Sequence, residues 1–121
     1  LISKSTFGQD TLSTSSLLSR KEVKKQDDFI NANILGKWKD QNSTTSFYPN
    51  GKYLTMFDDG RKDYGRWKVK KRIITLSSIL PYEDANFTLL YFSKTKMQLQ
   101  QNIYSQNRSS NWIAVKISNS P

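Results

Sequence analysis

Beyond Ile34 the chain consists of short runs of aromatic and β-branched residues separated by turn-forming residues. The runs are about six to nine residues long, and Gly, Pro, Asn and Asp lie between them at hairpin spacing. Asn50-Gly51 is the clearest turn, because this pair readily adopts the positive φ angles of a type I′ hairpin. The pattern predicts strands over residues 34–40, 43–48, 52–58, 62–70, 72–79, 86–92, 95–102 and 110–118.

The short connections limit how these strands can pair. Parallel neighbours require a crossover of about a dozen residues or more, so strands joined by short turns pair antiparallel in sequence order. Closing such a meander into a ring removes its exposed edges. We therefore expect an all-β fold, a small antiparallel up-and-down barrel of about eight short strands over residues 34–118. A barrel of this size encloses only side chains or one small ligand.

The residues before the barrel divide into two parts. Residues 1–18 are rich in Ser and Thr and poor in large apolar groups, so burial cannot offset the entropy of ordering them, and we expect a flexible tether. Ser19 and Glu22 have the spacing of a capping box. This motif predicts one short helix over residues 19–33. Its thin apolar stripe, of Val23, Ile30 and Phe29, is expected to cover one end of the barrel.

The composition excludes most kinds of active site. The chain has no Cys and no His, so it lacks disulfides, thiolate and imidazole groups, and the usual ligands of zinc and haem. The adjacent carboxylates Asp58-Asp59 and Glu83-Asp84 fall in expected turns, where acidic residues usually face solvent. We expect no catalytic residues, no metal and no cofactor, and hence no enzyme. No run reaches the roughly 18 apolar residues of a membrane helix, so we expect no transmembrane segment.

Positive charge is concentrated in the expected barrel. Lys and Arg total 19 against 10 Asp and Glu, a formal charge of +9 that favours anionic partners. Strand alternation places four basic residues on one face, with Tyr64, and Trp67 and Val69 on the other. The four basic residues are Lys62, Arg66, Lys68 and Lys70. We interpret them as a solvated outer face; the alternative is a site for nucleic acid or another polyanion.

Large apolar residues of the expected strands form a candidate inner surface. The full set is Trp38, Phe47, Tyr53, Phe57, Trp67, Val69, Ile74, Leu76, Phe87, Leu89, Tyr91, Met97, Leu99, Ile113 and Val115. If the barrel is hollow, the ligand-binding residues are expected to be Trp38, Phe47, Tyr53, Phe57, Trp67, Leu89, Tyr91 and Met97. If it is filled, the two Trp side chains plug it, which is the interpretation we favour. Gly36 and Gly65 are expected to allow close packing or a strand bend under these rings.

Three short motifs resemble one known family. Gly36-Lys37-Trp38 looks like the Gly-x-Trp signature that begins the barrel of lipocalins, and Gly65-Arg66-Trp67 repeats it. Residues 47–53, Phe-Tyr-Pro-Asn-Gly-Lys-Tyr, resemble the hairpin of small bacterial lipocalin-like domains. The resemblance covers about residues 34–118. It implies a meander barrel without enzymatic activity, in a secreted or lipid-anchored protein of the cell envelope.

These observations lead to one expected function and one alternative. We expect a non-enzymatic binding or interaction module of the bacterial cell envelope, which binds a small apolar ligand inside the barrel or docks on a partner protein. The expected location is periplasmic or extracellular, with an anchor through a removed N-terminal segment. The alternative is a basic barrel that binds nucleic acid or another polyanion on its Lys- and Arg-rich face.

Overall fold

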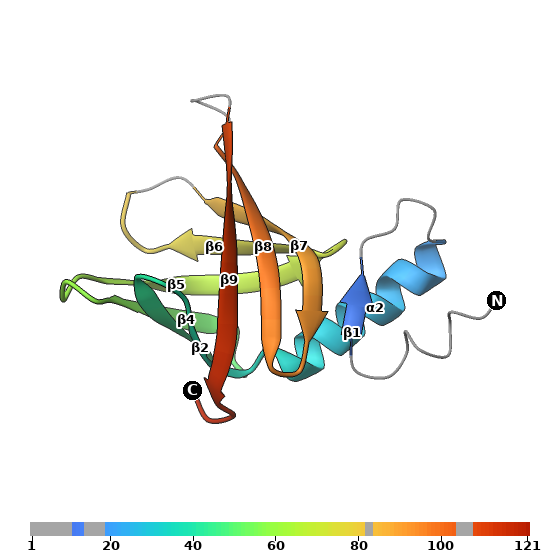
Figure 1. The fold of residues 1–121 in the computed structure, drawn as a ribbon, viewed down its shortest axis with the longest axis horizontal. Coiled ribbons are helices and arrows are strands. Elements are labelled where there is room, and N and C mark those ends of the chain that lie inside the picture. The colour runs from blue at the N-terminus through green and yellow to red at the C-terminus, as the bar shows by residue number, and fades with distance from the viewer. Residues whose placement is uncertain (1–10, 14–18, 82–83, 104–107) are drawn as a thin grey trace.

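The computed structural model describes residues 11–13, 19–81, 84–103 and 108–121, which form helix α2 (Arg20–Asn33) and nine strands (Figure 1). The strands are β1 (Thr11–Ser13), β2 (Gly36–Lys39), β3 (Ser43–Phe47), β4 (Lys52–Phe57), β5 (Lys62–Lys70), β6 (Ile73–Ser78), β7 (Ala85–Ser93), β8 (Lys96–Ile103) and β9 (Arg108–Ser118). None of the helices in these ranges is long and apolar enough to cross a membrane.

Strands β2 to β9 form a closed meander. Each strand pairs antiparallel with the next one in sequence, and β9 returns to pair with β2. The ring therefore has eight strands, which confirms the predicted all-β up-and-down barrel. The first barrel strand begins at Gly36, two residues later than predicted. Ile34 still belongs to the helix terminus, where its N–H donates to the Ile30 carbonyl.

The expected tether contains one short strand. Thr11–Ser13 form β1, which pairs antiparallel with Tyr91–Ser93 at the end of β7. The β6 partners of β7 extend only to Thr88, so this end of β7 is open to another strand on that side. Such an open strand end readily accepts a further strand. The other residues of the expected tether, 1–10 and 14–18, lie outside the described residues.

Helix α2 begins as the sequence predicts. The Ser19 hydroxyl accepts from the Glu22 N–H at 3.2 Å, and the Glu22 carboxylate accepts from the Ser19 N–H at 3.2 Å, which completes the capping box. Gln26 and Ile30 form the buried face of the helix. Val23 is only half-buried. The predicted apolar stripe is thus confirmed at Ile30, and the polar Gln26 completes it.

Helix α2 is attached to the turn between β5 and β6. The Asp27 carboxylate accepts from the backbone N–H groups of Lys71 at 2.7 Å and Arg72 at 2.9 Å. These two turn residues have φ angles of 52° and 61°, the left-handed values that a type I′ turn requires. A carboxylate that accepts two N–H bonds makes a strong contact, so it fastens the helix to this end of the barrel.

The type I′ turn was predicted at the wrong hairpin. At Asn50-Gly51 only the glycine has a positive φ, of 82°, and the turn is closed by a bond from the Gly51 N–H to the Tyr48 carbonyl. The chain between β3 and β4 is therefore longer than a two-residue turn. The hairpin itself is confirmed, because Phe47 faces Tyr53 across the two strands.

Glycines allow close backbone contacts at two points of the barrel. A Cβ added to Gly36 would lie 2.3 Å from the Ser118 carbonyl oxygen, and one added to Gly65 would lie 2.0 Å from that of Ser77. Real Cβ atoms do not approach an oxygen so closely. The predicted close packing at Gly36 and Gly65 is therefore confirmed, and the contacts are with the backbone of β9 and β6.

Candidate functional site

The barrel encloses a cavity of about 640 Å³. Exposed residues from the β2–β3 and β4–β5 turns form its rim, and Figure 1 shows the β4–β5 hairpin at the opposite end of β5 from α2. The barrel is hollow near this rim. The lining residues are Trp38, Asp40, Asn42, Ser43, Thr45, Phe47, Tyr53, Thr55, Phe57, Asp58, Asp59, Arg61, Asp63, Ile74, Leu76, Ser78, Ala85, Phe87, Met97, Leu99, Gln101, Trp112 and Ala114.

Trp38 closes the cavity on the side of α2. Its side chain is 1% exposed, and its Nε1 donates to the Ile34 carbonyl at 2.7 Å. Its ring lies 5.8 Å from that of Phe92, which in turn packs edge-on against Phe29 of the helix at 5.9 Å. The expected indole plug is thus present at this end, while the space toward the rim is open.

Most of the predicted ligand-binding residues line the cavity. They are Trp38, Phe47, Tyr53, Phe57 and Met97. Trp67 does not line it: its Nε1 donates to the Tyr48 carbonyl at 3.0 Å, and its ring packs edge-on against Phe47 at 5.7 Å. Leu89 is 2% exposed and belongs to the core rather than to the cavity wall.

The prediction for Tyr91 was wrong because β7 contains an irregularity. Its register against β8 shifts between Leu89 and Tyr91. A bulge of this kind inserts one residue and reverses which face the following side chains take. Phe92, with no exposed surface, occupies the core position that simple alternation assigns to Tyr91, and Tyr91 is only half-buried.

The predicted inner face of β9 was also wrong. Ile113 and Val115 are 52% and 48% exposed, whereas Trp112 and Ala114 line the cavity. Lys116 is in phase with these inward-facing residues. Its Nζ donates to the Asn33 carbonyl at 2.7 Å and lies 5.2 Å from the Trp38 ring centroid. Burial lowers the pKa of Lys116, as expected for an ammonium at the barrel end.

One carboxylate lies in the aromatic wall. Asp63, on the inward face of β5, accepts from the Tyr53 hydroxyl at 2.8 Å and from the Ser78 hydroxyl at 2.5 Å. Burial, together with the hydrogen bond to Asp63, raises the pKa of Tyr53 well above its usual range. The phenol therefore stays protonated and donates. Beside this group, the Thr45 and Thr55 hydroxyls share a hydrogen bond of 2.8 Å.

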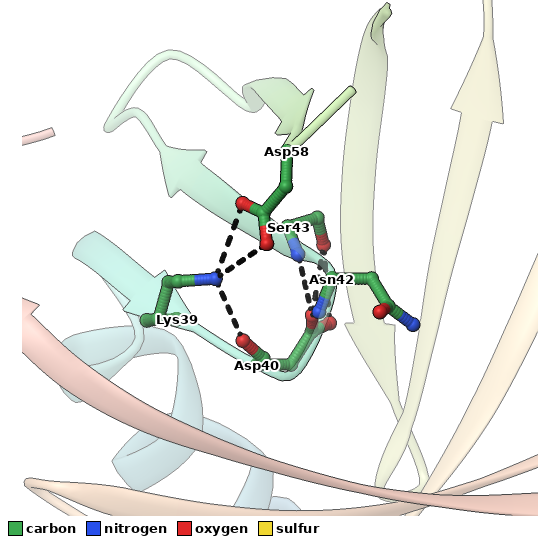
Figure 2. A network of polar contacts seen from close by, with 5 residues as sticks. All are labelled: Lys39, Asp40, Asn42, Ser43 and Asp58. Carbon is green, nitrogen blue, oxygen red and sulfur yellow. Dashed lines mark hydrogen bonds and ion pairs between the residues drawn. The ribbon is translucent and has the colours of Figure 1, made fainter. Parts of the chain in front are cut away.

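A polar network forms one side of the rim, as Figure 2 shows. The Lys39 ammonium lies 3.3 Å and 3.4 Å from the two Asp58 carboxylate oxygens and donates to the Asp40 carbonyl at 2.9 Å. The Asp40 carboxylate accepts from the N–H groups of Asn42 and Ser43, both at 2.8 Å. These bonds hold the β2–β3 turn against the β4–β5 turn.

A second ion pair lies at the rim, within the β4–β5 turn. The Arg61 Nε lies 2.8 Å from an Asp59 carboxylate oxygen, and the guanidinium carbon lies 4.6 Å from the Phe57 ring centroid. The backbone N–H and the guanidinium of Arg61 hold the pKa of Asp59 below its usual range. Asp58 and Asp59 thus occupy a turn, as predicted, while Glu83 lies outside the described residues.

The described residues do not assemble a metal site. No group of three or more His, Cys, Asp or Glu residues in the described ranges is placed to hold a metal ion. Hydroxyl, carboxylate and aromatic groups dominate the cavity wall instead. This combination suits non-covalent binding of an organic molecule.

The basic face of β5 is arranged as predicted. Lys62, Arg66, Lys68 and Lys70 are all exposed, and they alternate with the inward-facing residues of the strand. Tyr64 lies in the same row and is 47% exposed. Across the sheet Lys52 pairs with Arg66 and adds a fifth cation to this outer surface. None of the ion pairs among the described residues involves these five cations.

Comparison of the chain with protein-family models, with curated proteins and with solved structures finds no match.

Proposed function

We propose that this protein is a non-enzymatic binding module that holds one small, largely apolar molecule inside its barrel. The cavity of about 640 Å³ is the observation that supports this function. Ligand sites typically measure about 300 to 1,000 Å³ and combine an apolar wall with a few polar groups. Phe47, Phe57 and Phe87 supply apolar wall here, and Tyr53 and Asp63 supply polar groups.

A neutral apolar fluorophore, N-phenyl-1-naphthylamine, tests the proposal directly. We expect it to bind with enhanced emission and with quenching of Trp fluorescence, because Trp38 and Trp112 line the cavity. Binding should not depend on salt, since the probe carries no charge. Ala114→Phe, which fills the cavity, should weaken binding about tenfold or more, the effect of losing roughly 1.4 kcal/mol of contact.

Val115→Phe is the matched control, because the neighbouring side chain points outward and is already 48% exposed. It should bind the probe as the wild type does. Ala85→Trp provides a second filling variant at the cavity wall in case Ala114→Phe unfolds. Absence of probe binding by folded wild-type protein, or equal binding by wild-type and folded filling variants, would contradict the proposal.

We further propose that the chain is a lipocalin-like protein of the bacterial cell envelope. The support is the closed meander with a helix at one end, together with the position of Gly36 and Trp38 at that end. Cell fractionation of the natural producer tests the location. Recovery in the periplasm or the medium supports it, and recovery in the cytosol contradicts it.

A second candidate function is polyanion binding on the outer face of β5. Four exposed cations in one row, with Tyr64 between them, support it. Alternate residues of a strand are about 7 Å apart, so the row can follow an extended phosphate chain while the ring stacks on a base. The charge of +9 would attract such a chain from a distance.

Replacing Lys62, Arg66, Lys68 and Lys70 with Gln tests this candidate. We expect the variant to elute earlier from heparin and the slope of log K against log salt for single-stranded DNA to fall by about 3. The control replaces Arg20, Lys21, Lys24 and Lys25, which are exposed on α2, and changes the net charge equally. If both variants lose the same affinity, general charge rather than the β5 face is responsible.

A further inference from the structure

We propose that the cavity selects organic cations, and that Asp63 is the residue that binds their charged group. The expected ligand class is a protonated amine on a small aromatic or aliphatic body. This inference rests on the proposed function, because it names the ligand class of the same cavity. It depends on the charges and contacts of the cavity wall.

The cavity has the opposite charge to the protein. Its wall contains the four carboxylates of Asp40, Asp58, Asp59 and Asp63, against the guanidinium of Arg61 in the wall and the Lys39 ammonium at the rim. The whole chain carries a formal +9. A concave surface lined by one sign of charge concentrates molecules of the opposite sign. Anionic ligands would therefore be attracted to the outer face of the barrel and disfavoured inside it.

The rim carboxylates already have partners. Asp58 is paired with Lys39 and Asp59 with Arg61. The Asp40 carboxylate accepts hydrogen bonds from two backbone N–H groups and from the Ser43 hydroxyl. These three acids therefore have local structural roles in the turns. Asp63 is the wall carboxylate that remains for a ligand.

The contacts of Asp63 are with neutral groups. One oxygen accepts from the Tyr53 hydroxyl and the other from the Ser78 hydroxyl, and the ion pairs of the described residues do not include it. A carboxylate can accept about four hydrogen bonds, so each oxygen retains capacity for another donor. An ammonium group supplies both the missing donor and the missing charge. The two hydroxyls orient the carboxylate before the ligand arrives.

The surrounding rings favour the same ligand class. Phe47, Tyr53, Phe57, Phe87 and Trp112 line the cavity, and the faces of aromatic rings attract cations. The rim already contains one such contact, between Arg61 and the Phe57 ring at 4.6 Å.

Three ligands with one carbon skeleton test the inference by titration calorimetry at pH 7. They are 1-naphthylmethylamine, which is cationic, 1-naphthalenemethanol, which is neutral, and 1-naphthoic acid, which is anionic. We expect the amine to bind about 10- to 100-fold more tightly than the alcohol, the usual effect of a hydrogen bond to a charged group. The acid should bind more weakly than the alcohol.

Asp63→Asn should remove the protein's preference for the amine over the alcohol. Its affinity for the alcohol should change less than threefold, which corresponds to about 0.6 kcal/mol of binding free energy. The matched control is Asp28→Asn, which makes the same charge change on the exposed face of α2 and should keep the preference. The wild-type comparison needs no variant, so it tests the preference for cations even if Asp63→Asn does not fold.

The outcomes separate this inference from the proposed function. If none of the three ligands nor N-phenyl-1-naphthylamine binds, the binding function itself fails. If the alcohol binds but the amine has no advantage, or if Asp63→Asn keeps the advantage, the cavity binds apolar molecules and the assignment to Asp63 is wrong.

Discussion

Gly65→Ala is expected to lower the free energy of unfolding by about 3 kcal/mol, at the upper end of the usual cost of overpacking. The added methyl group would lie 2.0 Å from the Ser77 carbonyl oxygen and 2.9 Å from the Ser78 Cα. Both obstacles are backbone atoms of the neighbouring strand, so no side-chain movement can relieve the clash. Strands β5 and β6 would have to separate at this point, where Gly65 pairs with Ser78.

Urea denaturation followed by Trp fluorescence measures this change. Lys68→Ala is the control, because Lys68 is exposed on the same strand and should change the free energy of unfolding by less than about 0.5 kcal/mol. A Gly65→Ala variant as stable as this control would show that the two backbones are not in close contact.

Trp38→Ala is expected to cost about 4 kcal/mol of unfolding free energy, the usual range for a fully buried large ring. The indole is 1% exposed, contacts Phe92, and supplies the donor for the Ile34 carbonyl. Its removal would leave a void beside the helix and an unpaired carbonyl at the helix terminus. Thermal and urea unfolding both measure the loss.

Trp38→Phe separates these two contributions, because it keeps an aromatic ring and removes the donor. The free energy of unfolding of Trp38→Phe should fall between those of the wild type and of Trp38→Ala. A loss below about 1 kcal/mol for Trp38→Ala would mean that Trp38 is not part of the core, and would contradict its role as the base of the cavity.

The overall fold could be predicted because many local signals agree. Each connection is too short for a parallel crossover, so the strand order follows the sequence order. Ser19 and Glu22 place the helix start correctly. The alternation of charged and apolar residues places every side chain of β5 on the observed face.

The errors arose where local pattern and tertiary packing disagree. The irregularity after Leu89 reverses which side chains of β7 point inward, and no residue at that position predicts it from the sequence. In β9 the β-branched residues looked like core, but Lys116 can share the inward face because it reaches a helix carbonyl at the barrel end. The turn at Lys71-Arg72 lacks Gly and Asn, so its φ angles had no signature in the sequence.

Asp63 could have been found from the sequence. It alternates in phase with Trp67 and Val69, and that phase places it on the inner face of β5. The run around it was interpreted through its basic and apolar residues, and Asp63 was assigned no role. An acidic residue in phase with apolar neighbours was the available signal, whereas the hydroxyl partners came from β4 and β6 and required the pairing register.

The attachment of Asp27 to the β5–β6 turn has a consequence for ligand exchange. Ile30 and Ile34 have no exposed surface, and with Trp38 they fill the helical end of the barrel in the described part of the chain. Under the proposed function, a ligand would then enter and leave the cavity at the opposite end, past the rim to which the β2–β3 and β4–β5 turns contribute. One bound molecule would have to leave before another could enter, so the proposed ligands would exchange one at a time.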